Sequence, residues 1–338
     1  MRLEEVKSTP LITIGIPTSN SAWSLPEVLA CILKLDYDKH RLRLVFPDNY
    51  SSDNSVEILD EFADKHESDF ESIVIEKVRA NIPVARNICF EKAAGSDYIF
   101  FLDSDIIVPP DTLTVLLQDF QKFNNVGMTS FPWDRANSKA RARSLFDGFV
   151  TTDGPMLAYK IGNGCNLLSM NAYKKVGKFN PKLYVHEDGE YCYRLRKHGF
   201  SIICDYSHSG THLKRVKWNA RFYLRFIWNS SNTYIEMLKL GSPMHILKLT
   251  TSIILVLSIV LSIVFHQIAP LLVFAVTAVV AFWANASRRV LDDGSRVKPS
   301  YYLVIPPVLT ALTVVVTGAI FVRLTERFVS RLFRGKTN

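Results

Sequence analysis

The sequence predicts an α/β fold with a mainly parallel sheet, followed by transmembrane helices in the carboxyl-terminal third. Two observations lead to this prediction. Before about residue 245, short apolar segments alternate with segments of helical spacing, whereas three long apolar runs follow that point. With 338 residues, the chain is long enough for one sizeable core and an appendage.

The expected strands are short apolar segments, each ended by a polar turn or loop. They are Leu11–Pro17, which ends in a loop, then Arg43–Phe46, Ile73–Glu76, Tyr98–Leu102 and Phe200–Cys204. Helical spacing recurs between the early strands, at Leu25–Leu33, Val56–Phe62 and Val84–Ala94. Strands that alternate with helices favour a parallel sheet covered by those helices.

Acidic residues follow two of these strands. Asp48 comes after the second strand, and Asp103 and Asp105 come after Tyr98–Leu102. Ligands of open α/β sheets bind at the carboxyl ends of the strands, so these carboxylates are candidates for one site.

The Asp103-Ser104-Asp105 tripeptide has two interpretations. It could cap the next helix or begin a turn. Alternatively, two carboxylates two residues apart on a loop can share a hard divalent cation, which neutralises a departing diphosphate. Asp48 is equally open, because it could form an Asx-turn with Ser51 or accept a hydrogen bond from a nucleobase.

Taken together, five ordered motifs resemble those of family 2 glycosyltransferases. They are Pro17 after the first strand, Asp48–Ser55, Val84–Asn87, Phe101–Asp105, and Glu187-Asp188 leading to Arg194-Leu195. The resemblance covers about Leu11 to Leu213. It implies the GT-A fold, a nucleotide-sugar donor and inversion at the anomeric carbon.

The resemblance also implies roles for individual residues. Asp48 would contact the nucleobase, and Pro17 and Arg86 belong to the donor-binding motifs. Asp103 and Asp105 would contact the ribose and a divalent metal, Mg²⁺ or Mn²⁺. Asp188 would be the catalytic base.

The chemistry independently requires such a base. Displacing a nucleoside diphosphate with a hydroxyl needs a group that takes the hydroxyl proton and positive charge on the leaving phosphates. Asp188 can be that group. Alternatively, Glu187 and Asp188 merely begin a helix, where acids are favoured by the helix dipole, and both interpretations can hold together.

Residues around position 210 supply further candidates. His208 and His212 follow a strand, and we select His212 as a possible metal ligand because Lys214 and Arg215 beside it can bind a diphosphate or an anionic headgroup. The acceptor and diphosphate candidates are Glu187, Lys214, Arg215 and Trp218. The stretch from Lys214 to Trp218 resembles a signature of processive polysaccharide synthases, but it lacks the Gln and has Lys for Arg, which argues against processivity.

The three apolar runs, Ile246–Phe265, Ile268–Ala284 and Tyr301–Val322, are each near the roughly 20 residues that cross a bilayer. Basic residues between the second and third runs predict a cytoplasmic loop, and the charged amino terminus without an apolar segment predicts a cytoplasmic catalytic domain. The side of the basic tail stays open, because Pro306-Pro307 could kink the third run or make it re-entrant.

The resulting organisation has four parts. We expect a catalytic domain at 1–215, amphipathic juxtamembrane helices at 216–244, a multi-pass membrane region at 245–322 and a basic amphipathic tail at 323–338.

Charge and cysteine content agree with this organisation. The net charge of +8 is not gathered in one aromatic-interleaved strip, so membrane lipids are favoured as partners and nucleic acid is not. The five cysteines lack metal-ligand or disulfide spacing and are expected to be buried thiols.

The predicted function is therefore metal-dependent transfer of a sugar from a nucleotide sugar to a hydroxyl of a lipid-linked glycan or glycolipid at the cell membrane. Synthesis of a polyprenyl-phosphate sugar is the alternative, and an inactive membrane scaffold with the same fold is a third hypothesis. The oligomeric state stays open.

Overall fold

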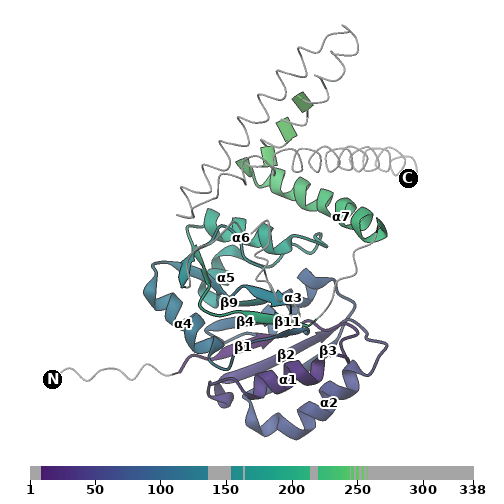
Figure 1. Ribbon diagram of the computed structural model, residues 1–338, viewed down its shortest axis with the longest axis vertical. Helices are drawn as coiled ribbons and strands as arrows, with labels where there is room; N and C mark the ends of the chain where they lie inside the picture. Colours follow the sequence, from purple (N-terminus) through teal and green to yellow (C-terminus); the bar gives the residue numbers. More distant parts are fainter. Residues whose placement is uncertain are drawn as a thin grey trace, which may run out of the picture. The chain divides into compact units, whose positions relative to one another are not determined.

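The computed structural model describes residues 9–135, 154–162, 164–213 and 220–243, with a few isolated positions between 245 and 257 (Figure 1). The chain divides into two compact units. The first consists of Met1–Ala142 and Thr152–Val216, and the second of Arg143–Thr151 and Lys217–Asn338.

The first unit is built on an eight-stranded sheet with the order β3-β2-β1-β4-β9-β6-β10-β8. In that order, its strands are Ser72–Lys77, Leu42–Asp48, Ile12–Gly15, Tyr98–Leu102, Cys165–Ser169, Val126–Ser130, Ser201–Asp205 and Pro155–Leu157. β1 pairs in parallel with β2 and β4, β2 with β3, and β6 with β10, whereas β9 and β8 are antiparallel to their neighbours. The prediction of an α/β fold with a mainly parallel sheet is confirmed.

A smaller sheet joins three distant short strands in the order β5-β11-β7. They are Ile106–Ile107, Gly210–His212 and Trp133–Arg135. His212 of β11 is paired with Ile106 of β5, so the histidine lies beside the Asp-x-Asp loop that ends at Asp105. This pairing connects segments that are far apart in the sequence.

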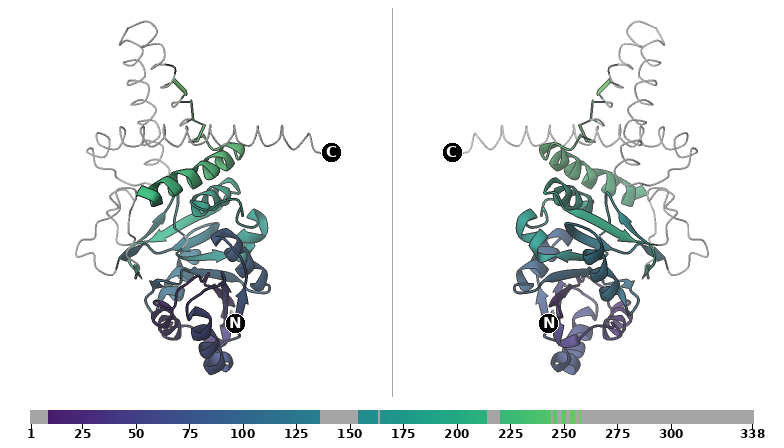
Figure 2. Two further views of the ribbon diagram at one scale, coloured as in Figure 1. Left: turned by 90° about the vertical axis from the view of Figure 1, so that its right-hand side faces the viewer. Right: turned by 90° about the vertical axis from the view of Figure 1, so that its left-hand side faces the viewer.

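Helices cover both faces of the large sheet (Figures 1 and 2). One face packs against α1 (Leu25–Leu33), α2 (Ser55–His66) and α4 (Thr112–Lys122), and the other against α3 (Ile82–Lys92), α5 (Met170–Val176) and α6 (Glu187–Lys197).

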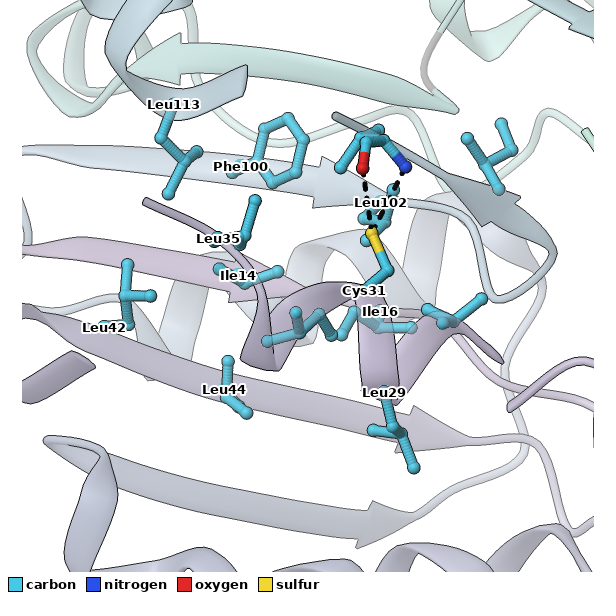
Figure 3. Close-up of a cluster of buried hydrophobic side chains, with 14 of the residues drawn as sticks. Ile14, Ile16, Leu29, Cys31, Leu35, Leu42, Leu44, Phe100, Leu102 and Leu113 are labelled. Atoms are coloured by element: carbon cyan, nitrogen blue, oxygen red, sulfur yellow. Dashed lines mark hydrogen bonds between the residues drawn. The ribbon is translucent and has the colours of Figure 1, made fainter. Parts of the chain in front are cut away.

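Alternation along the strands explains the two cores. Phe100 and Leu102 of β4 belong to the first core, whereas Ile99 and Phe101 belong to the second, because successive side chains of a strand point to opposite faces. Figure 3 shows the first core, in which the Cys31 thiol of α1 lies 3.2 Å from both the amide and the carbonyl of Val108.

Local signals fix the ends of several helices. α3 begins after Asn81, whose side chain accepts a hydrogen bond from the amide of Val84 at 3.1 Å, and proline stands in the first turn of both α1 and α3. Two short 3₁₀ turns, Lys39–Arg41 and Glu67–Asp69, lead into β2 and β3. The predicted helices thus exist, but α2 starts one residue earlier and ends four residues later than expected.

The second unit contains α7, Ala220–Lys239, an uninterrupted helix within the range predicted to hold juxtamembrane helices (Figure 2). Tyr234 of this helix donates to the carbonyl of His245 at 3.2 Å. Among the described residues, no helix combines the length and apolar character that a membrane span requires. The predicted runs Ile268–Ala284 and Tyr301–Val322 lie outside the described residues, as does most of Ile246–Phe265, so the transmembrane helices stay a prediction.

Candidate active site

The site lies at the carboxyl edge of the parallel strands. Asp48 is the last residue of β2, and Asp103 directly follows β4, two strands away in the same sheet. The loop after β1 is tied to the Asp-x-Asp loop, since the Ser21 and Ser104 hydroxyls lie 2.8 Å apart and the Ser24 hydroxyl donates to the Ser104 carbonyl at 2.7 Å. The edge is therefore a connected set of loops.

Arg86 of α3 links the two acidic motifs. Its side chain is only 3% exposed, and its guanidinium lies 3.1 Å from Asp103 Oδ1 and 2.5 Å from Glu187 Oε1. Burial by itself lowers the pKa of Arg86, but the carboxylates of Asp103 and Glu187 outweigh that effect and raise the pKa above its usual value. The guanidinium is therefore a fixed positive charge between the motifs.

α3 also holds the segment that precedes the second motif. The Asn87 side chain exchanges two hydrogen bonds with the backbone of Phe179, at 2.9 and 2.8 Å. At the start of α3, the side-chain amide of Asn81 donates to the carbonyl of Pro181 at 2.8 Å. His186 then adopts a left-handed conformation, with φ at 59°, and α6 begins at Glu187. The helix-start interpretation of Glu187-Asp188 is thus correct, and it leaves the catalytic interpretation open.

The two adjacent acids have different partners. Glu187 is bound by the buried Arg86, whereas Asp188 accepts from the amide of Gly189 at 2.7 Å and lies 3.7 Å from the half-exposed ammonium of Lys160. Asp188 is 19% exposed at its side chain. Of the two, Asp188 is therefore the one that an incoming hydroxyl can approach without displacing a buried ion pair.

Sequence reasoning missed Lys160. This lysine belongs to none of the five motifs, and its segment is placed by a backbone hydrogen bond from Ala158 to Ile202 of β10 at 2.8 Å and by the burial of Ile161. No local signal in the sequence indicates that Lys160 pairs with Asp188, 28 positions away. The pairing of β8 with β10 brings Lys160 to α6.

The candidate metal ligands are partly assembled. Asp105 Oδ2 lies 3.3 Å from His212 Nε2, and the amide of Leu213 donates to the Asp105 carbonyl at 2.9 Å. His208, the other histidine that the sequence offered, instead lies 2.9 Å from Asp111 and stacks on Phe131.

The Asp105 carboxylate and the His212 imidazole could supply some of the ligands of a hard divalent cation. Carboxylate oxygens and an imidazole nitrogen suit Mn²⁺, and Mg²⁺ commonly takes one or two carboxylates together with substrate phosphates. Within the ranges that the structure describes, no group of three or more acidic, His or Cys side chains is close enough to hold a metal without such help. Asp105 and His212 are therefore the protein ligands to which a diphosphate could add its oxygens.

Asp48 is fully buried at the end of β2. Its carboxylate accepts from the Ser51 amide at 2.9 Å and from the Ser51 hydroxyl at 2.5 Å. The carboxylate thus holds its own loop, as the turn interpretation expected, but the bond to the Ser51 amide spans three residues and not the two of an Asx-turn. Pro17 is also buried, two residues after the end of β1. Contacts of Asp48, Pro17 and Arg86 with a donor stay predictions.

The remaining candidates are Lys214, Arg215 and Trp218, and they lie outside the described residues. Their proposed contacts with an acceptor or a diphosphate stay predictions as well.

Residues 13–176 match the family model described as glycosyl transferase family 2. That range holds the first four motifs of the site and ends before Glu187-Asp188, which the structure joins to them through Arg86.

Two curated relatives illustrate the similarity. A poly(ribitol-phosphate) beta-glucosyltransferase of Bacillus spizizenii is 26% identical over 215 residues, with 56% of this chain and 33% of the relative covered. An undecaprenyl-phosphate 4-deoxy-4-formamido-L-arabinose transferase of Pseudomonas syringae is 32% identical over 111 residues, with 32% of each covered. The chain spans less than half the length of such relatives.

Among solved structures, the mannosyltransferase PcManGT from Pyrobaculum calidifontis, in complex with GDP-Man and Mn²⁺, has a TM-score of 0.58. The match covers 94% of this chain and 88% of the mannosyltransferase, at 16% sequence identity. At that identity the similarity establishes a common fold.

Proposed function

Because the chain belongs to glycosyl transferase family 2, we propose that it is an inverting, metal-dependent transferase that moves a sugar from a nucleotide sugar to a lipid-linked acceptor at a membrane. The single observation that most supports this function is the bridge made by Arg86. It fixes the Asp-x-Asp loop and the Glu187-Asp188 motif beside one another, as a displacement at an anomeric carbon requires.

In the proposed reaction, Asp188 accepts the proton of the acceptor hydroxyl while that oxygen attacks the anomeric carbon. The bond from this carbon to the diphosphate oxygen breaks, and the diphosphate leaves with the electron pair. Asp188 suits this role because its exposed partner, Lys160, can move aside, whereas Glu187 is held by a buried guanidinium. Arg86 positions both motifs and adds positive charge near the leaving group.

A divalent cation held by Asp105 and His212, with Asp103 nearby, would neutralise charge on the leaving diphosphate. The mannosyltransferase of the same fold is in complex with Mn²⁺, which supports such an ion. Asp103 would then contact the donor. Arg86 binds only Oδ1 of Asp103, and the Asp103 side chain is 38% exposed.

The acceptor class rests on two lines of support. One relative is named for a poly(ribitol-phosphate) acceptor and another for undecaprenyl phosphate, so both a hydroxyl and a phosphate acceptor occur among the relatives. The apolar runs after residue 245 favour an acceptor presented at the membrane. The position of Asp188 favours a hydroxyl acceptor, because a hydroxyl needs a base to take its proton and an ionised phosphate does not.

Polyprenyl-phosphate sugar synthesis is the second candidate, and the ammonium of Lys160 beside Asp188 favours it. A phosphate acceptor would be attracted to that charge and would not require proton removal.

The test uses the full chain, purified in detergent. UDP-glucose, UDP-N-acetylglucosamine and GDP-mannose are incubated with it in Mn²⁺ or Mg²⁺, with and without membrane lipid extract, and products are identified by mass spectrometry. We expect the new sugar to remain bonded to another sugar after mild acid, whereas a sugar linked directly to polyprenyl phosphate would be released as the monosaccharide. Absence of both turnover and nucleotide binding would leave only the scaffold hypothesis.

A further inference from the structure

A pair of buried carboxyl groups between α4 and β10 has no role in the proposed reaction. Asp119 of α4 has no exposed surface, and Asp205, the last residue of β10, is 1% exposed. The two side chains are hydrogen-bonded to each other. Two ionised carboxylates cannot form such a bond, because their oxygens only accept. One of the two groups must therefore carry a proton.

The surroundings of Asp119 disfavour its ionised form. Its Oδ2 is buried and meets no donor among the described residues, and its Oδ1 lies 3.5 Å from the half-exposed ammonium of Lys122 on the same helix. β6 and β9, which also pack against α4, contain no charged residue. Burial, and then the charge of Asp205, raise the pKa of Asp119 to about 6. The shared proton is therefore lost as pH approaches neutrality.

Asp205 also begins the segment that leads to the candidate metal ligand His212. Its Oδ1 accepts from the amide of Ser207 at 2.8 Å, which holds the turn after β10. His208 then lies 2.9 Å from Asp111, the residue that precedes α4. Residues 205–212 are thus tied to α4 at two points, one before its first turn and one in its last turn.

The two ties differ in their exposure to water. The His208 and Asp111 side chains are 25% and 49% exposed, and an exposed pair of this kind contributes little to stability. The Asp119–Asp205 pair is excluded from water, where an unpaired charge is costly. The protonation state of the buried pair therefore determines how firmly residues 205–212 are held on α4.

Loss of the shared proton places two negative charges against each other inside the protein. The repulsion is relieved if residues 205–212 move off α4 and water reaches Asp119. In that open form Asp119 regains the ordinary pKa of an aspartic acid, near 4. Since its pKa of about 6 in the closed form is higher, the closed form gains stability at low pH and loses that gain as pH rises from ~4 to ~6.

We propose that the proton shared by Asp119 and Asp205 is a pH-dependent latch, which holds residues 205–212 against α4 and releases them as pH rises. The segment ends at His212, which lies 3.3 Å from Asp105, so the latch extends to the candidate active site. Neither the latch nor its test depends on the proposed function.

Hydrogen–deuterium exchange of the full chain in detergent tests the latch at pH 5 and pH 7.5. The amides of residues 206–212 are suited to it because they include bonded ones, such as that of Gly210, which donates to the Pro132 carbonyl at 2.9 Å. Each rate is divided by the intrinsic rate at its pH. The opening of this segment should increase about tenfold from pH 5 to pH 7.5, as pKa values of about 6 closed and about 4 open require.

The amides of β2 report global unfolding in the same experiment. At pH 7.5, residues 206–212 should exchange faster than β2, because they open locally while the sheet stays folded. Equal protection of the two would mean that the segment opens only when the whole unit unfolds. That result, or an opening of residues 206–212 that does not change with pH, would overturn the latch.

Asp119→Asn replaces the titrating group by an amide, which donates at every pH. Its opening should change less than about twofold between the two pH values. Asp205→Asn keeps an oxygen for the Ser207 amide and removes the opposing charge, so its pH response should also be smaller than in the original chain. Asp64→Asn, at an exposed position of α2, should retain the tenfold change. If one of the two latch variants fails to fold, the other decides, and an undiminished pH response in a folded latch variant would contradict the inference.

Discussion

The guanidinium of Arg86 reaches across 101 positions of the sequence to lie 2.5 Å from the carboxylate of Glu187. Since the same guanidinium also binds Asp103, one buried side chain determines the spacing of both acidic motifs. Breaking a buried ion pair by removing one partner is costly because the other charge stays desolvated.

Arg86→Met should therefore lower the free energy of unfolding by about 2–4 kcal/mol and reduce transfer more than 10²-fold in the folded fraction. Urea unfolding and the initial rate of transfer measure the two effects. Arg43→Met is the matched control, because Arg43 binds Glu71 at 2.9 Å near the opposite end of β2. The control should lose stability and keep its specific activity. Equal activity losses in both variants would show that Arg86 acts only through stability.

Asp188→Asn should retain affinity for the donor and lose transfer by roughly 10²- to 10⁴-fold, because the amide has the same shape but cannot take a proton. Equilibrium binding of the donor and single-turnover transfer give the two numbers. Glu187→Gln serves as the comparison, since it removes the negative charge that pairs with the buried Arg86 and should lower stability as well as rate. A donor affinity that falls as far as the rate would assign Asp188 to binding.

Asp105→Ala and His212→Ala should each weaken Mn²⁺ binding in the presence of UDP, because these two side chains are the proposed protein ligands. Electron paramagnetic resonance of Mn²⁺ reports this binding without turnover. His208→Ala is the control, since His208 forms a similar pair with Asp111. Mn²⁺ affinity that depends on His208 and not on His212 would reverse the choice between the histidines.

Asp119 of α4 should make stability depend on pH. Burial, together with the nearby Asp205, raises the pKa of Asp119 to about 6. The folded protein therefore binds this proton more tightly than the unfolded chain, whose Asp pKa is about 4. The contribution of Asp119 to stability is highest below pH ~4 and is lost as pH rises to ~6.

Asp119→Asn removes this titration. The melting temperature of the variant minus that of the original chain should therefore increase from pH 4.5 to pH 8. Asp64→Asn, at an exposed position of α2, should show no such trend. A difference between Asp119→Asn and the original chain that stays constant with pH would contradict the assignment.

Gly15→Ala should destabilise the first unit. A methyl group at Gly15 of β1 would lie 2.8 Å from both Cβ and Sγ of Cys89 on α3, and overpacking of this kind costs about 1–3 kcal/mol. Thermal unfolding measures the loss, and Cys89→Ala in the same chain should recover part of it by removing the sulfur. An unchanged melting temperature in Gly15→Ala would mean that α3 shifts freely away from β1.

The local sequence was sufficient for the acidic motifs and for five strands, β1 to β4 and β10, whereas β6, β8 and β9 of the large sheet and the three short strands of the small sheet were not predicted. Tyr98–Leu102 was predicted with its observed bounds, because a run of five apolar and aromatic residues ended by Asp103 is a strong strand signal. The position of Asp103 at a sheet edge followed from that strand, and the family resemblance followed from the order of the motifs. Helix ends were less accurate, as α2 shows, because they depend on tertiary contacts as well as on propensity.

Only the tertiary structure decided which of these residues touch. The sequence favoured His212 over His208 only through its basic neighbours, and the pairing of β11 with β5 placed His212 beside Asp105. Nothing in the sequence indicated that Lys160 lies near Asp188 or that Arg86 binds both acidic motifs. These contacts depend on how β8 and α3 pack. Local periodicity thus determined the elements and the chemistry available at their ends, whereas long-range packing determined the partner of each charged group.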